Sequence, residues 1–260
     1  MFATRNRSRQ FGAMLTLVWF LTATFVAVLG PTQAALAATN PFTQGTTGFD
    51  ISYPNCGISN LPPASNGATY RFGIVGVTGG RAFSTNSCLA QEYALVAGSP
   101  LTLSLYMNLN YPIGTTASKG NSGPAGNCTH SDKACQAYNY GYNAAQNAYG
   151  YASQNNAFAS TWWLDVETVN SWSSKASLNV RVIQGAVDYL QNVAHVQVGI
   201  YSTASMWNRI TGSATLGLPI WVAGAAELSR TACQSAKGFN GGPIWLIQHV
   251  NGSFDEDFAC

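Results

Sequence analysis

Two acidic residues, Asp165 and Glu167, stand one residue apart at the end of an apolar, β-prone run that reads Trp-Trp-Leu over positions 162–164. In a strand, side chains two residues apart point to the same face of the sheet, roughly 7 Å apart along the chain. Two carboxyl groups that converge at the mouth of a sheet or barrel could hydrolyse a glycosidic bond, because one of them can protonate the leaving oxygen. The chain has only ten Asp and Glu in 260 residues, so such a pair is unusual.

The Asp-x-Glu spacing alone is weak evidence for this chemistry, since about 0.09 such strings are expected by chance in a chain of this composition. The competing interpretation is a structural pair whose charges are satisfied by Arg, Lys or main-chain donors. The context favours a functional pair, because unpaired carboxylates are costly to bury at the end of an apolar strand.

Other catalytic and metal-binding patterns are absent from the sequence. It has no Gly-x-Ser-x-Gly elbow, no His-Glu-x-x-His and no P-loop, so a hydrolase of another class ranks last. No Cys-x-x-Cys occurs, and His130, His195 and His249 are scattered, so we expect no metal site and no cofactor. His249 could bind sugar hydroxyls or an acid near a strand end, but a structural role is favoured without ligand-like spacing.

The N-terminus has the three parts of a secretory signal peptide. Arg5, Arg7 and Arg9 precede an apolar stretch over residues 14–29, and an Ala-Leu-Ala motif ends at Ala37. The alternative is a membrane anchor, but the sixteen apolar residues fall short of the usual span. We therefore expect residues 1–37 to be removed, and the protein to be secreted, extracellular or associated with the cell wall, without membrane attachment.

Removal of that segment changes the charge and leaves every cysteine in place. Nine Lys and Arg then face ten Asp and Glu, so the net charge is about −1 and a nucleic-acid partner is not expected. Six cysteines in an exported chain predict disulfides, although fifteen pairings are possible. We expect Cys128 with Cys135 to close a local loop, and the remaining pairs to be Cys56 with Cys88 and Cys233 with Cys260.

The elements that would position the acids alternate along the chain, which predicts an α/β barrel. After a short lead-in over residues 38–47, residues 48–260 are expected to form one domain. In a barrel of parallel strands, catalytic residues sit at the carboxyl ends, and Asp50, Asn108, Glu167 and Tyr201 are at or near such ends. Strands are expected at 48–51, 72–77, 101–108, 161–167, 196–201, 219–223, 244–249 and 253–258, helices at 88–96, 134–154, 178–191 (capped by Ser177) and 204–210, and a loop at 114–127.

The chain resembles the lysozyme-like glycoside hydrolases of family 25, and the resemblance runs in order over residues 48–258. The matching motifs are Asp50 in the opening strand, Asp165-Val166-Glu167 ending the fourth, Gly199-Ile200-Tyr201 in the fifth, Trp221 in the sixth, and Trp245 and Gln248 followed by Asp255.

The resemblance implies a TIM-like barrel of roughly five βα units followed by strands with little helix. It implies hydrolysis of the β-1,4 bond between N-acetylmuramic acid and N-acetylglucosamine in peptidoglycan, by a monomer. Glu167 matches the general acid/base, and Asp165 matches the carboxylate that orients the substrate's 2-acetamido group. Asp50 and Asp255 match two supporting acids. The residues that could offer flat faces to sugar rings, or else pack the barrel, are Tyr106, Tyr201, Trp221 and Trp245.

Three segments depart from the family's pattern. The second strand of many relatives ends in Thr-Glu-Gly, whereas this chain has Thr78-Gly79-Gly80 and lacks the acid. The Trp-Gln-Tyr of relatives becomes Leu-Ile-Gln-His over 246–249, and Gly224-Ala225 replaces a tyrosine after the sixth strand. These departures favour an alternative function, a non-catalytic barrel that binds cell-wall glycan, while the intact Asp-x-Glu favours the enzyme.

Overall fold

The computed structural model describes residues 1–2, 39–252 and 254–260. The chain divides into two units, Met1–Ala37 and Ala38–Cys260, and the second contains every helix and strand described below. The predicted signal peptide, residues 1–37, lies outside the described residues apart from Met1 and Phe2, and it stays a prediction. Within the described ranges, no helix has the length and apolar character needed to span a bilayer.

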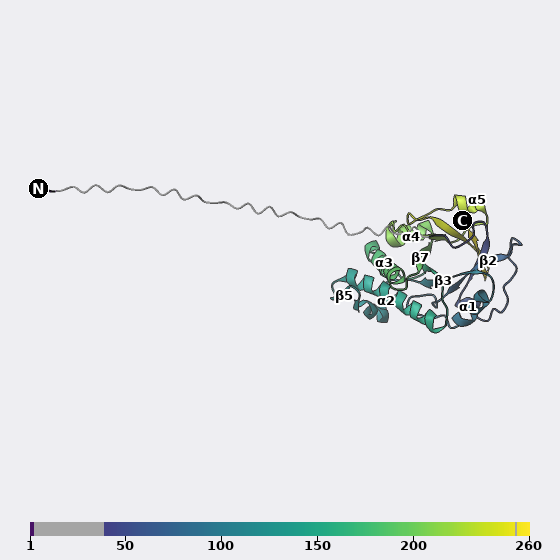
Figure 1. Cartoon of the computed structure of the whole chain (residues 1–260), viewed down its shortest axis with the longest axis horizontal. Coiled ribbons are helices and arrows are strands. Elements are labelled where there is room, and N and C mark those ends of the chain that lie inside the picture. The colour runs from purple at the N-terminus through teal and green to yellow at the C-terminus, as the bar shows by residue number, and fades with distance from the viewer. Residues whose placement is uncertain (3–38, 253) are drawn as a thin grey trace. The chain divides into compact units, whose positions relative to one another are not determined.

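Eight strands close into a barrel in the order β1-β10-β9-β8-β7-β6-β3-β2 (Figure 1), which confirms the predicted α/β barrel. Seven of them run in the same direction, whereas β10 runs antiparallel to its neighbours β9 and β1. The strands are β1 Thr47–Ile51, β2 Tyr70–Gly76, β3 Thr102–Asn108, β6 Thr161–Asp165, β7 Gln197–Ser202, β8 Ile220–Val222, β9 Ile244–Asn251 and β10 Phe254–Ala259.

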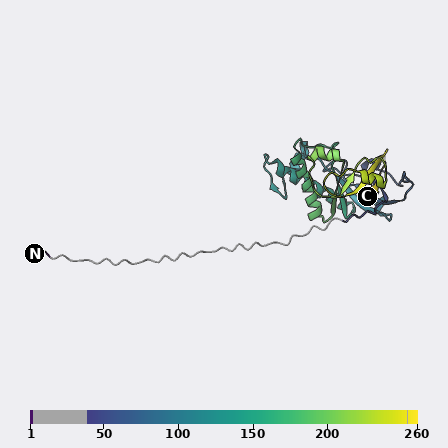
Figure 2. The ribbon, with the colours of Figure 1, turned by 90° about the horizontal axis from the view of Figure 1, so that it is seen from above.

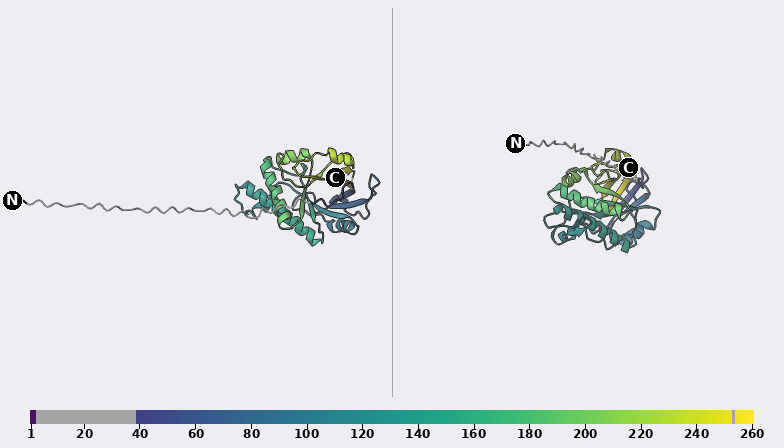
Figure 3. Two further views of the ribbon diagram at one scale, coloured as in Figure 1. Left: turned by 45° about the horizontal axis from the view of Figure 1, so that its top comes forward. Right: turned by 60° about the vertical axis from the view of Figure 1, so that its left-hand side comes forward.

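Helices cover the outside of the barrel, and the two longest, α2 and α3, lie side by side (Figure 3). The α-helices are α1 Leu89–Ala97, α2 Lys133–Gln154, α3 Ala176–Asn192, α4 Ala204–Thr211 and α5 Arg230–Ser235. Only a 3-10 turn, η1 Tyr53–Asn55, follows β1, and no helix was predicted there. Pro54, Pro62 and Pro63 suit that segment, because proline lacks the amide donor that a helix interior needs. Five βα units follow, from β2 with α1 to β8 with α5, and the short α5 is the helix that was not predicted.

Two smaller expectations needed correction. The predicted loop 114–127 contains a 3-10 helix, η2 Gly114–Gly120, and a hairpin of β4 Ser122–Gly123 with β5 Gly126–Asn127, at the margin of the ribbon in Figure 2. Helix α3 starts at Ala176, so Ser177 is not its cap. Buried Asn179 instead holds the entry to this helix, with its Oδ1 accepting from the Ser173 main-chain N–H at 2.9 Å.

The three disulfides have the expected pairing. Cys56–Cys88 joins the segment after β1 to the start of α1, and Cys128–Cys135 closes the loop before α2. Cys233–Cys260 joins α5 to the C-terminal residue. Cross-links of this kind stabilise a fold chiefly by restricting the unfolded chain.

Side chains alternate between the helical layer and the barrel interior along β6. Trp162 and Leu164 point outward, and Trp162 packs against Tyr149 of α2 with ring centroids 5.7 Å apart. Trp163 and Asp165 point inward. The period of two therefore places an aromatic ring and a carboxyl group on the same interior face, one above the other.

A cluster of buried aromatic rings fills the barrel interior below the acids, and we call it the aromatic plug. It consists of Phe42, Phe72, Trp163, Trp221 and Trp245. Ring centroids are 4.9 Å apart for Phe42 and Phe72, and 5.7 Å apart for Trp163 and Trp221. The predicted lead-in contributes Phe42 to the plug, so this part of residues 38–47 is packed against the barrel. The plug provides a dry, rigid floor for any site at the opposite end.

Candidate active site

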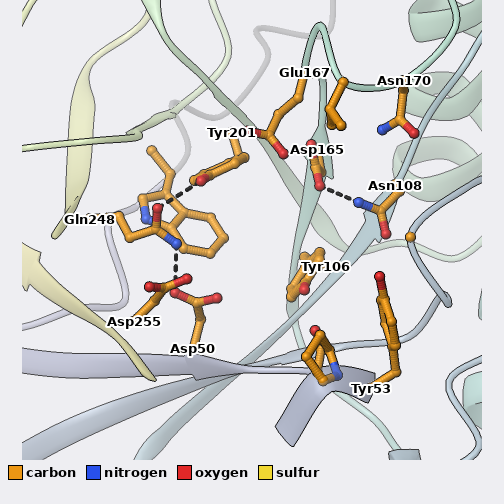
Figure 4. A pocket seen from close by; sticks show the side chains of 15 residues that line it. Asp50, Tyr53, Tyr106, Asn108, Asp165, Glu167, Asn170, Tyr201, Gln248 and Asp255 are labelled. Atoms are coloured by element: carbon orange, nitrogen blue, oxygen red, sulfur yellow. Dashed lines mark hydrogen bonds between the residues drawn. The ribbon is translucent and has the colours of Figure 1, made fainter. Parts of the chain in front are cut away.

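A pocket of about 280 Å³ opens at the end of the barrel where the parallel strands have their carboxyl ends (Figure 4). Four acids line it, and they are the four that the sequence singled out: Asp50, Asp165, Glu167 and Asp255. The neutral residues around them include Tyr53, Tyr106, Asn108, Asn170, Tyr201, Trp221 and Gln248. We call this site the acid pocket.

Strand direction explains how acids from distant parts of the sequence meet. Asp50 lies near the carboxyl end of β1, and Asp165 ends β6. Asp255 lies near the start of β10, but this strand is antiparallel, so its start is at the same edge and Asp255 pairs in register with Asp50. Glu167 follows two residues after β6 and reaches the pocket from the loop, so the predicted strand 161–167 is two residues too long.

Asp165 is held by an amide that is itself held from behind. Asn108 ends β3 opposite Asp165, and its Nδ2 donates a hydrogen bond to Asp165 Oδ2. The Thr78 hydroxyl donates to Asn108 Oδ1 at 2.6 Å, and the Asn108 main-chain N–H donates to Thr78 Oγ1 at 2.9 Å. Because Thr78 occupies the amide oxygen, the NH₂ group must face the carboxyl group of Asp165.

The carboxyl groups of Asp165 and Glu167 lie next to each other in the pocket (Figure 4) and affect each other's pKa. Burial raises the pKa of Asp165 well above its ordinary value, and the charge of Glu167 and a hydrogen bond with it add to the rise. Burial also raises the pKa of half-buried Glu167, while the hydrogen bond from Asp165 lowers it and the charge of Asp255 raises it. The two carboxyl groups therefore share a proton at pH values where isolated acids would both be ionised.

One oxygen of the pair lacks a protein donor. Asp165 is only 4 % exposed, and its Oδ1 receives no hydrogen bond from any amide, hydroxyl or main-chain group among the residues the structure describes. A buried carboxylate oxygen without a donor is unfavourable unless a ligand or a proton satisfies it. A donor on a bound molecule, or the proton shared with Glu167, would satisfy this oxygen.

Asp50 is linked to Tyr201 through Gln248. Gln248 Nε2 donates to Asp50 Oδ2 at 2.8 Å, and the Tyr201 hydroxyl donates to Gln248 Oε1 at 2.7 Å. Burial, and next the charge of Asp255, raise the pKa of Asp50 to about 7, although the hydrogen bond from Gln248 lowers it. Asp50 is therefore partly protonated near neutral pH.

A fifth acid, Asp257, lies deeper in the barrel and was not anticipated. It is fully buried, and its Oδ1 accepts a hydrogen bond from Trp221 Nε1 at 2.8 Å. Burial, and then the charge of Asp50, raise its pKa well above the ordinary value. Trp221 is thereby fixed with its ring centroid 4.4 Å from that of Tyr201. The sequence could have indicated Asp257 by its place two residues after Asp255, because residues two apart on a strand face the same side.

The structure brings three of the four predicted sugar-binding aromatics to the acid pocket: Tyr106, Tyr201 and Trp221. Trp245 is a correction, because it is 4 % exposed and packs in the aromatic plug with its ring centroid 6.3 Å from that of Trp163. It is the second residue of β9, and β9 runs parallel to β8, so Trp245 lies at the end of the barrel opposite the pocket. Tyr53 and Asn170 line the pocket without having been singled out in the sequence, whereas Asn108 had been noted at a strand end and Gln248 in the family motif, neither with a role in the site.

The glycines that replace the family's second-strand acid have geometric reasons to be glycine. Gly80 has φ +84°, which side chains rarely adopt. A Cβ on Gly79 would lie 2.9 Å from the main-chain oxygen of Thr85. The loop after β2 is therefore built around small residues, and an acid at position 79 would require it to move.

His249 lies outside the acid pocket. The Nδ1 of His249 lies 2.8 Å from the main-chain oxygen of Ala225. Over the described residues, no cluster of three or more His, Cys, Asp or Glu side chains is arranged to hold a metal ion.

Comparison with known proteins gives a consistent result. A family model described as "Lysozyme-like protein 1" matches residues 131–239. The chain is 39 % identical over 75 residues to a Dictyostelium discoideum protein named "Probable GH family 25 lysozyme 4", which covers 28 % of this chain and 34 % of that relative. The match thus spans about a third of the length of this curated relative.

Solved structures share the fold at low sequence identity. A family GH25 lysozyme from Aspergillus fumigatus has a TM-score of 0.54 at 17 % identity, covering 84 % of this chain and 95 % of that one. A muramidase from Acremonium alcalophilum has a TM-score of 0.55 at 18 % identity, covering 83 % and 93 %. At such identities the likeness concerns the fold, here an eight-stranded barrel.

Proposed function

We propose that the chain is a member of the lysozyme-like glycoside hydrolases of family 25, and that it cleaves the β-1,4 bond between N-acetylmuramic acid and N-acetylglucosamine in peptidoglycan. The observation that carries this proposal is the coupled carboxyl pair, Asp165 and Glu167, at the open end of a barrel whose opposite end is closed by aromatic rings. Two further acids, Asp50 and Asp255, line the same pocket.

Glu167 is the proposed proton donor. It extends from a loop, is half-buried, and has a raised pKa, so it can both reach a bound glycan and hold a proton. Its proton passes to the glycosidic oxygen as the bond to the anomeric carbon breaks, because an alcohol leaves far more readily than an alkoxide. The charge of Asp255 helps to keep Glu167 protonated.

Asp165 is the proposed partner of the substrate's 2-acetamido group. Asn108 fixes one of its oxygens, and the other lacks a protein donor in the described chain, so it can accept the acetamido N–H. That contact makes the acetamido oxygen a better nucleophile toward the anomeric carbon, and it stabilises the positive charge that develops. When the acetamido N–H binds Asp165, the shared proton belongs to Glu167, which is where catalysis needs it.

The aromatic residues of the pocket would bind the sugar rings. Tyr201 and Trp221 come from the neighbouring strands β7 and β8, Tyr106 comes from β3, and all three line the pocket with the acids. The hydrogen bonds from Trp221 to Asp257 and from Tyr201 to Gln248 hold two of these rings in place. A preformed aromatic wall of this kind suits the apolar faces of pyranose rings.

We also propose that the mature protein is exported and acts as a monomer. Three disulfides and no free cysteine among the described residues are typical of proteins that fold in an oxidising compartment. Cleavage after Ala37 would leave a chain that begins just before the packed segment containing Phe42. N-terminal sequencing of secreted protein tests this, and recovery of only the full-length chain in membranes would contradict it.

A second candidate function is a barrel that binds cell-wall glycan without cleaving it. The observation that favours it is the loop after β2, where Gly79 stands in place of the acid in the Thr-Glu-Gly of the family that the sequence resembles and has little room for a side chain. The experiment that separates the two is incubation of the mature protein with purified peptidoglycan, followed by mass spectrometry of the soluble fragments. Fragments with muramic acid at the reducing end support the enzyme, whereas sedimentation with the wall and no fragments supports the binding barrel.

A further inference from the structure

A second pocket, of about 450 Å³, adjoins the acid pocket at the same end of the barrel, and we call it the Arg81 pocket. Val169 and Asn170 belong to the lining of both, so the two sites are neighbours along one surface. Its walls come from the loops after β2, β3 and β6, represented by Arg81, Ile113 and Ser171. A glycan whose scissile bond lies in the acid pocket would pass beside it.

The two pockets differ in charge. Four acids line the acid pocket, whereas Arg81 is the one charged residue, and no acid occurs, among the described residues that line its neighbour. The main chain of Arg81 bonds with Ser84: the Arg81 N–H donates to Ser84 Oγ at 3.3 Å, and the Ser84 hydroxyl donates to the Arg81 main-chain oxygen at 2.6 Å. Lys119 adds positive charge close by, with its Nζ 5.6 Å from the centroid of the Phe83 ring.

Hydrogen bonds to buried groups fix the walls of the Arg81 pocket. Asn110 Oδ1 accepts from the Ala82 main-chain N–H at 2.9 Å, and its Nδ2 donates to the Tyr140 hydroxyl at 2.9 Å. The Tyr111 main-chain N–H donates to the Ser171 oxygen at 2.8 Å, which joins the loop after β3 to the loop after β6. The site is therefore largely preformed, so binding there requires little ordering.

We propose that the Arg81 pocket binds a carboxylate carried by the glycan strand whose cleavage is proposed above, so this inference rests on that proposed function. The guanidinium of Arg81 would hold the carboxylate through paired N–H donors, a geometry that arginine favours. Exposed Ile113 and Val169 offer apolar contacts for methyl groups next to it. The carboxylate belongs either to the lactyl group of muramic acid or to its attached peptide.

The test compares Arg81→Gln with the wild type, and with Arg71→Gln as a matched control. Arg71 is also exposed but lies near the start of β2, away from the carboxyl ends. Binding is measured by sedimentation with three cell-wall preparations: intact peptidoglycan, peptidoglycan with its carboxylates amidated, and glycan from which the peptides were removed. Glu167→Gln is included in every chain so that the wall is not degraded, and melting temperatures check folding.

We expect Arg81→Gln to weaken binding to intact peptidoglycan about tenfold, since a hydrogen bond to a charged group is worth about 1.5–3 kcal/mol. Arg71→Gln should have no effect, and amidation should remove the difference between wild type and Arg81→Gln. The lactyl carboxylate is free only where no peptide is attached, so a loss confined to intact peptidoglycan identifies a carboxylate of the peptide. A loss on peptide-free glycan as well shows that the lactyl carboxylate freed by peptide removal is also bound.

Equal binding of wild type and Arg81→Gln to intact peptidoglycan, or an equal loss on the amidated wall, would overturn the inference. A parallel digest with Glu167 intact separates this from failure of the proposed function. Cleavage without charge-dependent binding leaves the enzyme standing and removes the carboxylate site. Charge-dependent binding without cleavage would support the carboxylate site and contradict the proposed enzymatic function.

Discussion

The two ends of the barrel interior are built from the same strands but carry opposite chemistry. One end holds the aromatic plug, and the other holds the acid pocket. On β6 the change takes two residues, from Trp163 to Asp165. Burial is the largest cause of the raised pKa of Asp50, Asp165 and Glu167. The comparison shows that the plug does more than fill space, because by excluding water it makes protonated acids possible above it.

The ends also differ in how their residues are held. Plug residues are fixed by ring packing, as for Trp163 against Trp221 and Trp245. The acids are fixed by amides, with Asn108 holding Asp165 and Gln248 holding Asp50. Trp221 belongs to both regions, since it packs in the plug and lines the acid pocket. Substitutions at the two ends should therefore separate stability from catalysis.

The largest effect on stability is expected from opening the plug. Trp163→Ala removes a fully buried ring and should lower the free energy of unfolding by about 3–5 kcal/mol, because the cavity cannot close completely. Chemical denaturation followed by circular dichroism measures it. Phe158→Ala, at a ring exposed on the surface, is the control and should change little. A loss below 1 kcal/mol for Trp163→Ala would show that the plug is not a rigid floor.

Stability should fall as the pH rises through the range where Asp50 titrates. The folded-state pKa of about 7 lies above the ordinary 3.8, so between these values the folded state binds more protons than the unfolded state. Unfolding free energy should therefore decrease from about pH 4 to pH 7, by about 1–4 kcal/mol. Asp50→Asn should reduce this dependence, measured by denaturation across the range, while Asp165, Glu167 and Asp257, whose pKa values are also raised, supply the remainder.

The control for this profile is Glu227→Gln, which removes an exposed acid remote from the acid pocket and should leave the slope unchanged. A wild-type stability that rises with pH over the same interval would mean that Asp50 is ionised in the folded protein. The desolvating role assigned to the plug would then be wrong.

A smaller effect, confined to turnover, is expected from the amide that holds Asp165. Asn108→Ala should lower kcat about 10- to 100-fold with little change in KM, because Asp165 loses the donor that fixes its orientation. The pH optimum should shift upward, since this hydrogen bond lowers the pKa of Asp165. Kinetics on soluble peptidoglycan fragments measure both quantities.

Asn143→Ala is the matched control. Asn143 also donates hydrogen bonds through its side-chain amide, but to the main-chain oxygens of Lys119 and Ser122, and it lies on α2 outside the pocket. If both variants lose the same activity, the effect of Asn108→Ala is general loss of structure and not a positioning effect.

Much of the fold followed from sequence pattern, and the exceptions have physical reasons. The regular spacing of apolar residues in α2 and the apolar run of β6 identified both elements closely. Helix α5 was not predicted, because its six residues are too few to show a helical repeat. The place of Trp245 was wrong because a buried aromatic looks the same in sequence at either end of a barrel.

The acids of the site were easier to predict than their partners. Few acids occur in the chain, so Asp50, Asp165, Glu167 and Asp255 stood out and could be matched to a family motif. Asn108 and Gln248 are ordinary polar residues until the barrel closes and places them beside those acids. Asp255 reaches the pocket only because β10 is antiparallel to β1, and no local sequence pattern predicts that direction.

The most direct test of the account compares wild type with Glu167→Gln on the same peptidoglycan. The substitution keeps the size and shape of the side chain but removes the transferable proton, so fragment release should fall by about 10²–10⁴ while sedimentation with the wall persists. Asp165→Asn should also lower the rate, and unchanged melting temperatures would show that both variants are folded. Equal rates of fragment release by wild type and Glu167→Gln would contradict the assignment of Glu167 as the acid.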